Sequence, residues 1–276
     1  MFGGGQAHKL RFNDTLKLTL PSEEDESSDS SSHHFHKSTK VERIILAEGT
    51  PMPSPRTYHA SCLVDKFMVV SGGEANNTDM TDMWVLDIEG SKWSQLEIQD
   101  VNCFQAKRFH SISTISQNRV VTFGGCHSEY VHLNDVNVFY LNDLVKSGGT
   151  NTQVKCVKLD FRGDSSLPNT RWGHSAAVYE DKIYILGGRN EQDIGDLHFL
   201  DLNKKKWSEI DLKHQLPKPR RRHSAVFISS SLVMFGGFDG EFYNDMHILH
   251  LKEAPKMRGF NSPSTINSDY SKLVDS

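Results

Sequence analysis

One short set of residues recurs four times along the chain in the same order, and this repeat limits the possible folds more than any other feature. An Arg precedes a His by two or three positions, a Gly pair follows, and an Asp comes nine to eleven residues after the first Gly. The His-to-His spacings are 51, 64 and 49 residues. The recurring residues are Arg56/His59, Arg108/His110, Arg171/His174 and Arg220/His223, then Gly72-Gly73, Gly124-Gly125, Gly187-Gly188 and Gly236-Gly237, then Asp82, Asp135, Asp196 and Asp245. Such a period indicates one supersecondary unit used repeatedly.

The clearest copy, residues 171–207, predicts a unit of four short strands. Its apolar runs are four to seven residues long and rich in β-branched and aromatic residues, which favours strand over helix. We expect strands at 175–179, 182–186, 197–202 and 206–210, with the Gly pair closing the second strand. One such sheet cannot bury both of its faces, so it needs neighbours of the same kind.

A four-stranded unit with a period near fifty residues predicts a β-propeller. The Gly pair, the Asp before the third strand, and a Trp in the fourth strand of two copies (Trp93 and Trp207) resemble the kelch repeat. WD-type repeats have a similar length, but their Gly-His and Trp-Asp pairs are absent from the expected places. The resemblance covers roughly residues 1–251 and implies an all-β, kelch-type β-propeller.

The repeat also predicts how the chain divides. We expect four recognisable blades, at about 48–98, 99–160, 161–212 and 213–251, after a partial N-terminal blade at 1–47 and before an irregular tail at 252–276. The partial blade contains an acidic, Ser-rich insertion at 21–40, which we expect to be disordered. Since the resemblance implies five to seven blades, the chain is predicted to be a fragment of a larger propeller. Unpaired strand edges then predict an oligomeric or poorly soluble protein.

The recurring His and Asp residues are predicted to be structural. Such residues can serve catalysis or bind metals, but a catalytic group is needed once, whereas a scaffold is needed in every unit. We expect them to tie loops to neighbouring blades, with the Trp filling space between blades. No nucleophile–base pair, phosphate loop or metal-spaced Cys/His set occurs. The sequence therefore predicts no enzyme activity, no cofactor and no metal, and we interpret the His tract at 33–36 as solvated.

Charge and cysteine content set further expectations. The formal net charge is −4, and the segment 21–36 holds five acidic residues and no Lys or Arg, so the remainder is near neutral. A near-neutral body is not built to bind nucleic acid, and no apolar run is long enough to span a membrane. Without C-x-x-C spacing, the four cysteines (Cys62, Cys103, Cys126 and Cys156) are expected to be free thiols in a cytoplasmic protein.

Function is expected where the repeats differ. The loops between second and third strands, and those leading into first strands, emerge on the same face of a four-stranded blade. They carry Tyr, Phe and Arg, the residue types that dominate binding hot spots. The candidate partner-binding residues are Arg189, Asn190, His127, Glu129, Tyr130, Phe238, Asp239 and Tyr243. An acidic or phosphorylated peptide with an apolar anchor is the predicted ligand.

Three functional hypotheses stay open at this point. The first is a non-catalytic protein–protein interaction module of a cytoplasmic scaffold or adaptor. The second is the substrate-recognition propeller of a BTB- or F-box-type ubiquitin ligase, because many kelch propellers are joined to such domains. The third is an accessory domain of an enzyme. The basic run at 218–222 offers a second docking site for an acidic partner.

Overall fold

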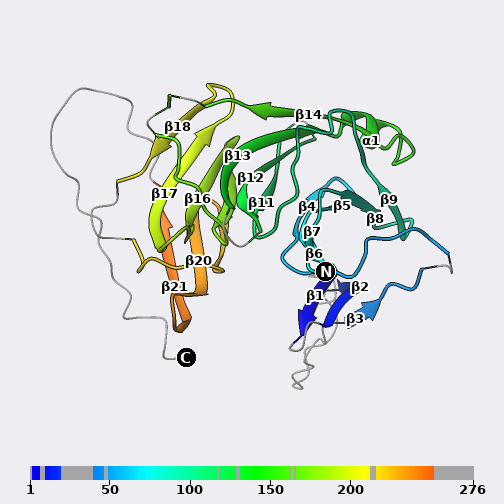
Figure 1. Cartoon of the computed structure of the whole chain (residues 1–276), viewed down its shortest axis with the longest axis horizontal. Coiled ribbons are helices and arrows are strands. Elements are labelled where there is room, and N and C mark those ends of the chain that lie inside the picture. The colour runs from blue at the N-terminus through cyan, green and yellow to red at the C-terminus, as the bar shows by residue number, and fades with distance from the viewer. Residues whose placement is uncertain are drawn as a thin grey trace, which may run out of the picture.

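A computed structural model describes residues 2–6, 10–19, 40–46, 49–116, 118–128, 131–161, 163–164, 166–211 and 216–251. Nearly all regular structure in these residues is β, and it forms five blade-like sheets arranged in an arc (Figure 1). The predicted all-β, kelch-type propeller of four blades and a partial N-terminal blade is therefore confirmed. The predicted tail at 252–276 and nearly all of the acidic insertion at 21–40 lie outside the described residues.

Within each sheet the main strands are antiparallel and follow the order of the chain. The first contains β1 (Phe2–Gln6), β2 (Leu10–Thr19) and β3 (Lys40–Arg43). The second contains β4 (Ala60–Val64), β5 (Phe67–Ser71), β8 (Met83–Asp87) and β9 (Lys92–Gln95), with the small hairpin β6 (Glu74–Ala75) and β7 (Thr78–Asp79). The third contains β11 (Ser111–Ile115), β12 (Arg119–His127), β13 (Val131–Tyr140) and β14 (Gln153–Leu159).

The insertion in the third sheet explains its longer spacing. It holds the helix α1 (Asn142–Lys146), and β14 also pairs in parallel with β10 (Glu97–Ile98) of the preceding connection. The fourth sheet contains β15 (Ser175–Tyr179), β16 (Lys182–Arg189), β17 (Asp193–Asp201) and β18 (Lys206–Glu209). The fifth contains β19 (Ser224–Ile228), β20 (Ser231–Phe238) and β21 (Phe242–His250).

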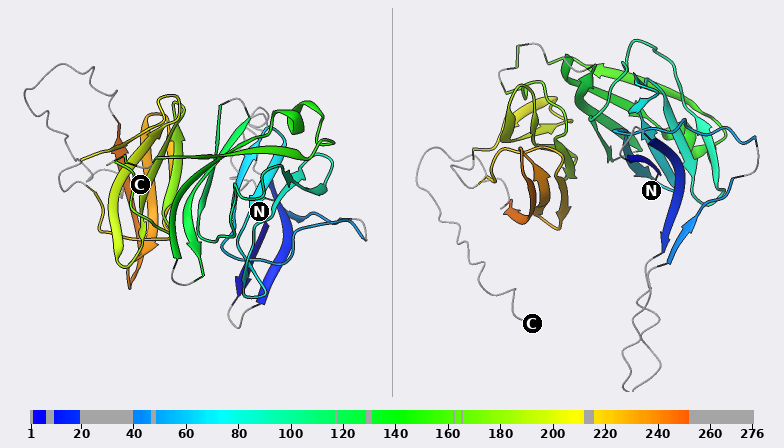
Figure 2. Two further views of the ribbon diagram at one scale, coloured as in Figure 1. Left: turned by 45° about the horizontal axis from the view of Figure 1, so that its top comes forward. Right: turned by 60° about the horizontal axis from the view of Figure 1, so that its bottom comes forward.

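The arc is open. The sheet of β1–β3 lies at one end and the sheet of β19–β21 at the other, with the three remaining sheets between them (Figures 1 and 2). The first strands of neighbouring four-stranded units, β4, β11 and β15, lie next to one another, and β19 follows β15. The loops that enter these strands therefore gather at one end of the axis, and they carry the candidate site.

The Gly pair has a different place in the strand from the one predicted. In the fourth sheet β16 continues through Gly187-Gly188 to Arg189, and its partner β17 begins at Asp193. The pairing register shifts between Leu186 and Gly188, which marks a bulge. Both glycines have positive φ, of 59° and 102°, so the bulge needs residues without a Cβ. The same shift occurs in β12 and β20, whereas β5 ends just before its Gly pair, as predicted.

The two tryptophans fill the space between blades, as predicted. Trp93 is fully buried and its ring lies 5.0 Å from that of Phe2 in the preceding sheet. Trp207 is equally buried, 5.3 Å from Phe123 of the preceding blade. Each Trp thus belongs to a hydrophobic core shared by two neighbouring sheets. Such a core is lost from both sheets if they separate, which couples the stability of successive blades.

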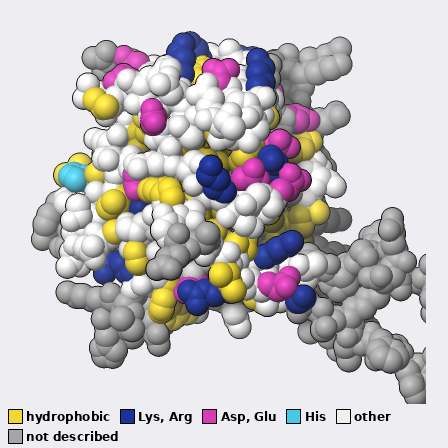
Figure 3. Space-filling view, turned by 90° about the vertical axis from the view of Figure 1, so that its right-hand side faces the viewer, with side chains coloured by type: hydrophobic (Ala, Val, Ile, Leu, Met, Phe, Trp, Pro, Cys, Tyr) yellow, Lys and Arg dark blue, Asp and Glu magenta, His cyan; other side chains and the backbone are white. Residues whose placement is uncertain are grey.

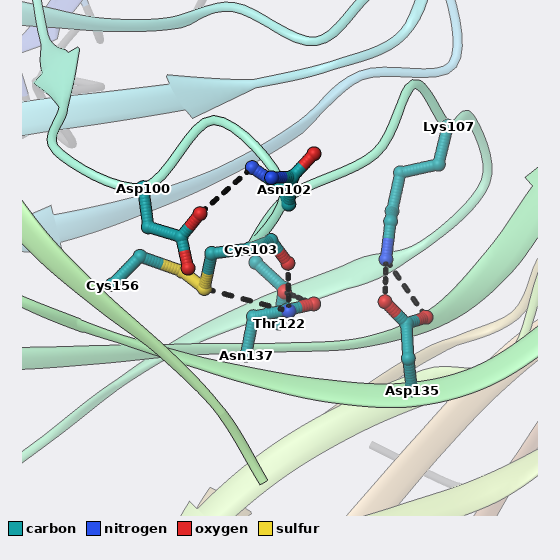
Figure 4. The surroundings of a disulfide bond; sticks show 8 residues. All are labelled: Asp100, Asn102, Cys103, Lys107, Thr122, Asp135, Asn137 and Cys156. Carbon is teal, nitrogen blue, oxygen red and sulfur yellow. Dashed lines mark hydrogen bonds and ion pairs between the residues drawn. A yellow bond between two sulfur atoms is a disulfide. The ribbon is translucent and has the colours of Figure 1, made fainter.

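The prediction of four free thiols was wrong for two of the cysteines. Cys103 and Cys156 form a disulfide, with their Cα atoms 6.0 Å apart (Figure 4). Cys103 lies in the loop after β10, and Cys156 lies on β14, which pairs with β10. The tertiary pairing of two strands distant in sequence brings the sulfurs together, which spacing along the chain cannot reveal. Cys62 and Cys126 are free, and Cys126 is buried.

The surface of the side that carries the second sheet mixes both signs of charge. Lys and Arg lie beside Asp and Glu there, among patches of hydrophobic side chains (Figure 3). A mixed surface of this kind does not make a field of one sign. Within the described part of the chain, no helix has the length and apolar content needed to span a membrane.

Candidate functional site

A buried cation stands at the entrance to each blade and pairs with the Asp of the same blade. Arg171 donates two hydrogen bonds to Asp196 and one to the carbonyl of Gly187 (3.0 Å). Burial opposes ionisation of Asp196, but hydrogen bonds from Arg171 and His198 outweigh it and hold the pKa of this carboxyl well below its ordinary value. The equivalent pairs are Arg56–Asp82, Lys107–Asp135 and Arg220–Asp245. Each pair fixes the loop entering a blade against the third strand of that blade or, for Asp82, against the residue directly before it.

In the second copy the cation is Lys107, so the prediction that Arg108 fills this place was wrong. The Lys107 side chain is fully buried, and its Nζ lies 2.7 and 2.8 Å from the two carboxylate oxygens of Asp135 (Figure 4). Arg108 instead donates to Glu74 of the preceding blade. With Lys107 in register, the His follows the cation by three residues in all four copies. The Lys107 ammonium reaches both oxygens of the carboxylate that an Arg binds in the other copies, so Lys can take the place of Arg here.

Successive blades are joined through the Gly pair and the His. In the first three copies the N–H of the second Gly donates to the carbonyl of the next blade's cationic residue, as from Gly188 to Arg220 (2.9 Å). The His rings reach back in the same way: Nε2 of His110 lies 2.7 Å from Ser71 Oγ, and Nε2 of His174 lies 2.9 Å from Ser111 Oγ. These contacts support the structural interpretation of the recurring His and Asp residues.

The residue two places after each cation lies at the axis. Tyr58, Phe109, Gly173 and Arg222 occupy this position, and all four have φ between 55° and 63°, in the left-handed region. The N–H of each of the last three donates to the carbonyl of its counterpart in the blade before, at distances of 2.9, 2.9 and 2.6 Å. These turns therefore follow one another around the axis and bring side chains from four blades together.

Three aromatic rings and one guanidinium form the centre of this end. We call Tyr58, Phe109, Trp172 and Arg222 the axial cluster. The rings of Tyr58 and Phe109 are stacked with centroids 4.0 Å apart, and Trp172 lies 5.0 Å from Phe109. The guanidinium carbon of Arg222 lies 4.9 Å from the Phe109 ring, 5.6 Å from Trp172 and 6.0 Å from Tyr58. Such cation–π contacts hold the guanidinium in place, while Tyr58 remains 45% exposed.

The charges beside the axial cluster are paired within the protein. Arg221 donates to both carboxylate oxygens of Asp193 (2.5 and 2.7 Å), and Asp193 also accepts a hydrogen bond from Arg189 (3.0 Å). Arg222 is exposed and makes no ion pair with any described residue. Since a guanidinium carries five N–H donors, Arg222 can offer several of them to a ligand that approaches along the axis.

The opposite rim has a similar pairing of charges. Glu74 accepts hydrogen bonds from Arg108 and from Arg11 of the partial blade. Asp79 lies 3.4 Å from Arg108 and 3.5 Å from His127. These contacts join three successive sheets through two buried carboxylates, so the charged side chains named here hold blades together.

The described site residues of the third and fourth sheets, His127, Arg189 and Asn190, lie on this end of the molecule. Arg189 is half-buried against Asp193, and its backbone bridges that of Trp172. Asn190 caps its own turn by accepting a hydrogen bond from the N–H of Gln192 (3.2 Å). His127 is exposed near Asp79. Glu129 and Tyr130 lie outside the described residues.

The predicted site residues of the last sheet contact one another. Phe238 packs under the guanidinium of Arg221, 4.7 Å from its ring centre, and its own backbone bridges that of Arg221. The hydroxyl of Tyr243 donates to Asp239 (2.6 Å), and this bond raises the pKa of Tyr243. The buried Arg220 stacks on the Tyr243 ring at 3.9 Å. Tyr243 therefore supports the entry loop of its own blade.

The sequence reasoning missed the whole axial cluster. Its signal was present in the sequence. The residue directly before the recurring His is Tyr58, Phe109 or Arg222 in three copies, and in the remaining copy Trp172 precedes His174 by two places. Large side chains at a position that turns toward the axis indicate a candidate binding surface. The scaffold itself needs only a small residue there, such as Gly173.

Two surface hollows occur at equivalent places in the repeat. One, of about 550 Å³, lies beside Asn134 and Asp135, and the other, of about 530 Å³, lies beside Asn13 and Asp14. Their recurrence at the same Asn-Asp step indicates a by-product of blade packing. Among the described residues, no group of three or more His, Cys, Asp or Glu side chains is placed to bind a metal.

Comparison with known proteins identifies the repeat. The profile of the KLHDC2/KLHL20/DRC7 Kelch-repeats domain matches residues 1–147 and 140–255. The chain is 29% identical over 178 residues to the dynein alpha chain of the flagellar outer arm of Chlamydomonas reinhardtii. It is 30% identical over 169 residues to Kelch domain-containing protein 3 of Rattus norvegicus, and 32% identical over 147 residues to the F-box/kelch-repeat protein At1g51550 of Arabidopsis thaliana.

These similarities cover half or more of this chain but less than half of each relative. The matched parts are 61%, 59% and 51% of this chain, in the same order. They are 4%, 42% and 30% of the relatives' own lengths.

Proposed function

Since the chain belongs to the kelch-repeat family, we propose that it is a non-catalytic module that binds a protein partner, within a cytoplasmic scaffold or adaptor. The observation that supports this proposal most directly is the axial cluster. It gathers three aromatic rings and an exposed guanidinium, which has no ion pair with any described residue, from separate blades at one point on the surface. Tyr, Trp and Arg are the residue types in which binding energy concentrates.

The chemistry of the cluster favours an acidic or phosphorylated segment with an apolar anchor. Arg222 offers a planar fork that can hold a carboxylate or phosphate through two parallel hydrogen bonds. Trp172 and Tyr58 offer rigid apolar area with polar tips. The arginines on the rim already have carboxylate partners, so Arg222 is the cation that we assign to the ligand.

The rim of the site comprises the loop residues that the sequence singled out. In this proposal they surround the axial cluster and supply secondary contacts to the partner. They are Arg189, Asn190, His127, Glu129, Tyr130, Phe238, Asp239 and Tyr243. Truncating any one of them is expected to weaken binding less than truncating Arg222 or Trp172, because central, desolvated contacts contribute most.

The test is to measure binding of acidic, phosphorylated and neutral peptides of matched length by the parent protein and by Arg222→Ala and Trp172→Ala. Arg119→Ala, at the start of β12 away from the axial end, is the matched control. Each axial variant is expected to weaken binding by about 2 kcal/mol or more, with the thermal transition unchanged. Alanine variants of the described rim residues are measured in parallel. Binding that survives both axial variants but is lost in the rim variants would place the site on the rim loops and not on the axial cluster.

A second candidate is substrate recognition for a ubiquitin ligase, favoured by the similarity to an F-box/kelch-repeat protein. Complexes purified with the parent chain and with Arg222→Ala separate the two ideas. In a ligase, both preparations contain ligase subunits, and only the parent carries ubiquitin-modified partners. Complexes without ligase subunits favour the scaffold or adaptor.

A further inference from the structure

The last sheet of the arc presents an apolar face to solvent. Val226 and Ile228 of β19, and Phe235 and Met246 of β20 and β21, are 51–62% exposed. Val226 is paired across the strands with Val233, and Phe235 is paired with Met246, so their side chains project from the same side of the sheet. We call these five residues the terminal face. A contiguous apolar patch on three adjacent strands indicates an interaction surface.

The fourth sheet has the same face in the same register, and there it is covered. Ala177, Tyr184, Leu186 and Leu197 occupy the positions equivalent to Val226, Val233, Phe235 and Met246. All four are buried against the fifth sheet, in one cluster with Leu232 and Met234. The terminal face is thus the next member of a series of sheet-to-sheet interfaces already present in the molecule. Its preferred occupant is a sheet that presents the face by which blades contact their predecessors.

The described part of the chain contains one sheet whose predecessor-facing side is uncovered. In the sheet of β1–β3, Phe2 and its cross-strand partner Thr15 are buried toward the second sheet. Leu18 and Val41 are paired with each other, and alternation along the strand places Leu18 on the side opposite to Thr15. They are 48% and 56% exposed. The two uncovered faces lie at opposite ends of the arc (Figure 1).

We propose that the terminal face binds the β1–β3 face of a second copy of this chain, head to tail. At every interface inside the arc, the face of one sheet that points to its successor contacts the face of the next sheet that points to its predecessor. The proposed contact repeats this arrangement between two molecules. Two terminal faces meeting about a two-fold axis would not follow it. Because a head-to-tail contact leaves one face free at each end, it adds further copies unless the rotation closes a ring.

Cysteine cross-linking distinguishes the possible occupants. Ile228→Cys and Val41→Cys are made separately in a Cys62→Ser background, mixed, and treated with a short bis-maleimide; Cys126 is buried and Cys103 is bonded to Cys156. The mixed adduct of the two variants is expected to dominate. A product formed by Ile228→Cys alone would replace the head-to-tail contact with a two-fold one. A third variant carries both Ile228→Cys and Val41→Cys in one chain. A cross-link within the monomer of this variant, without an adduct in the mixture, would indicate closure of the arc within one chain, and either result overturns the proposal.

Sedimentation of the unmodified protein gives an independent readout. The parent is expected to form species whose mass rises with concentration, and Phe235→Glu is expected to remain monomeric with an unchanged circular dichroism spectrum. Val101→Glu, at an exposed apolar position in a loop, is the matched control and is expected to assemble like the parent. A parent that stays monomeric across the concentration range would overturn the proposal.

Discussion

The imidazole of His223 lies directly over Gly187 of the preceding blade. A Cβ placed on Gly187 would stand 2.9 Å from His223 Cε1 and 2.8 Å from the carbonyl oxygen of Arg220. Gly236, the equivalent residue of the last blade, has no such neighbour, and its Cβ would meet only the carbonyl oxygen of Tyr243 at 3.2 Å. The two glycines have similar φ values, 59° and 69°. They therefore separate the cost of the backbone conformation from the cost of contact between blades.

Substitution of these glycines by Ala tests this separation. Gly236→Ala is expected to lower the free energy of unfolding by about 1–2 kcal/mol, the cost of a left-handed conformation for an L-residue. Gly187→Ala is expected to cost about 3 kcal/mol or more, because the His223 ring and the Arg220 backbone must also move. Urea unfolding of both variants measures the difference. Equal losses would mean that the contact between blades contributes nothing at Gly187.

The buried histidines predict a loss of stability on acidification. Burial lowers the pKa of His59 and His223 to about 4, and that of His174 to about 3, from an ordinary value of 6.5. Above pH 6.5 these groups are neutral in both folded and unfolded chains, so their contribution is complete. As the pH falls from about 6.5 toward 4, the unfolded chain takes up protons that the folded protein does not. The free energy of unfolding is therefore expected to fall through this window, as measured by urea midpoints at successive pH values.

A neutral replacement isolates one histidine. His223→Gln cannot titrate, and we expect its stability to fall less steeply than that of the parent between pH 6.5 and 4, by roughly 3 kcal/mol over the window. The pKa of Asp196 and of Asp245 lies below its ordinary value of 3.8 in the folded protein, so these carboxyls also reduce the stability as the pH approaches 4. They do so equally in the parent and in the variant, and the difference between the two profiles therefore reports His223. Parallel profiles for the parent and the variant would assign the acid sensitivity to other groups.

The disulfide makes a prediction about redox state and stability. Cys103 and Cys156 are 53 residues apart, and in the chain-entropy account a cross-link closing a loop of that size stabilises by about 4 kcal/mol. The double variant Cys103→Ser/Cys156→Ser is expected to unfold at lower urea concentration than the oxidised protein. Mass spectrometry after alkylation is expected to find two free thiols before reduction and four after it. Four alkylated cysteines without reductant would show that the thiols stay apart.

The repeat was readable from sequence because its parts depend on local requirements. Gly187 and Gly188 are needed for a bulge with positive φ, and Trp207 is needed to fill the space between two sheets. Each requirement selects one residue type at one spacing, and four copies make the pattern visible. The strands of the fourth sheet were predicted within a few residues, although β16 runs through the Gly pair and β17 begins three residues before Asp196.

The parts that were not predicted depend on contacts between copies. Asp135 pairs with the cation three residues before His110, and this cation is Lys107 in place of the expected Arg108. The pairing is a tertiary contact, which the spacing of residues along the chain does not show. Arg222 belongs to the axial cluster only because the entry turns of four blades follow one another around the axis. A linear pattern lists side chains by spacing, but it does not show which of them converge.

The buried cation–Asp pairs at the entrances to the blades predict a difference in stability between a buried Arg and a buried Lys that has lost its carboxylate partner. Asp196→Asn leaves Arg171, whose side chain is fully buried, without its carboxylate, and breaking a buried pair in this way typically costs about 3–5 kcal/mol. Arg cannot lose its proton in a protein, whereas Lys can. Asp135→Asn is therefore expected to cost less, because Lys107 can become neutral. Burial already lowers the pKa of Lys107 despite Asp135.

The pH dependence of the two variants provides the decisive comparison. In Asp135→Asn, the folded protein releases the Lys107 proton at lower pH than the unfolded chain does, so unfolding takes up a proton. The free energy of unfolding of this variant is expected to rise with pH up to the ordinary pKa of Lys, about 10.4. Asp196→Asn has no such group and is expected to gain nothing over the same range. Urea unfolding between neutral and alkaline pH measures both slopes, and a flat profile for Asp135→Asn would mean that Lys107 keeps its charge or leaves the interior.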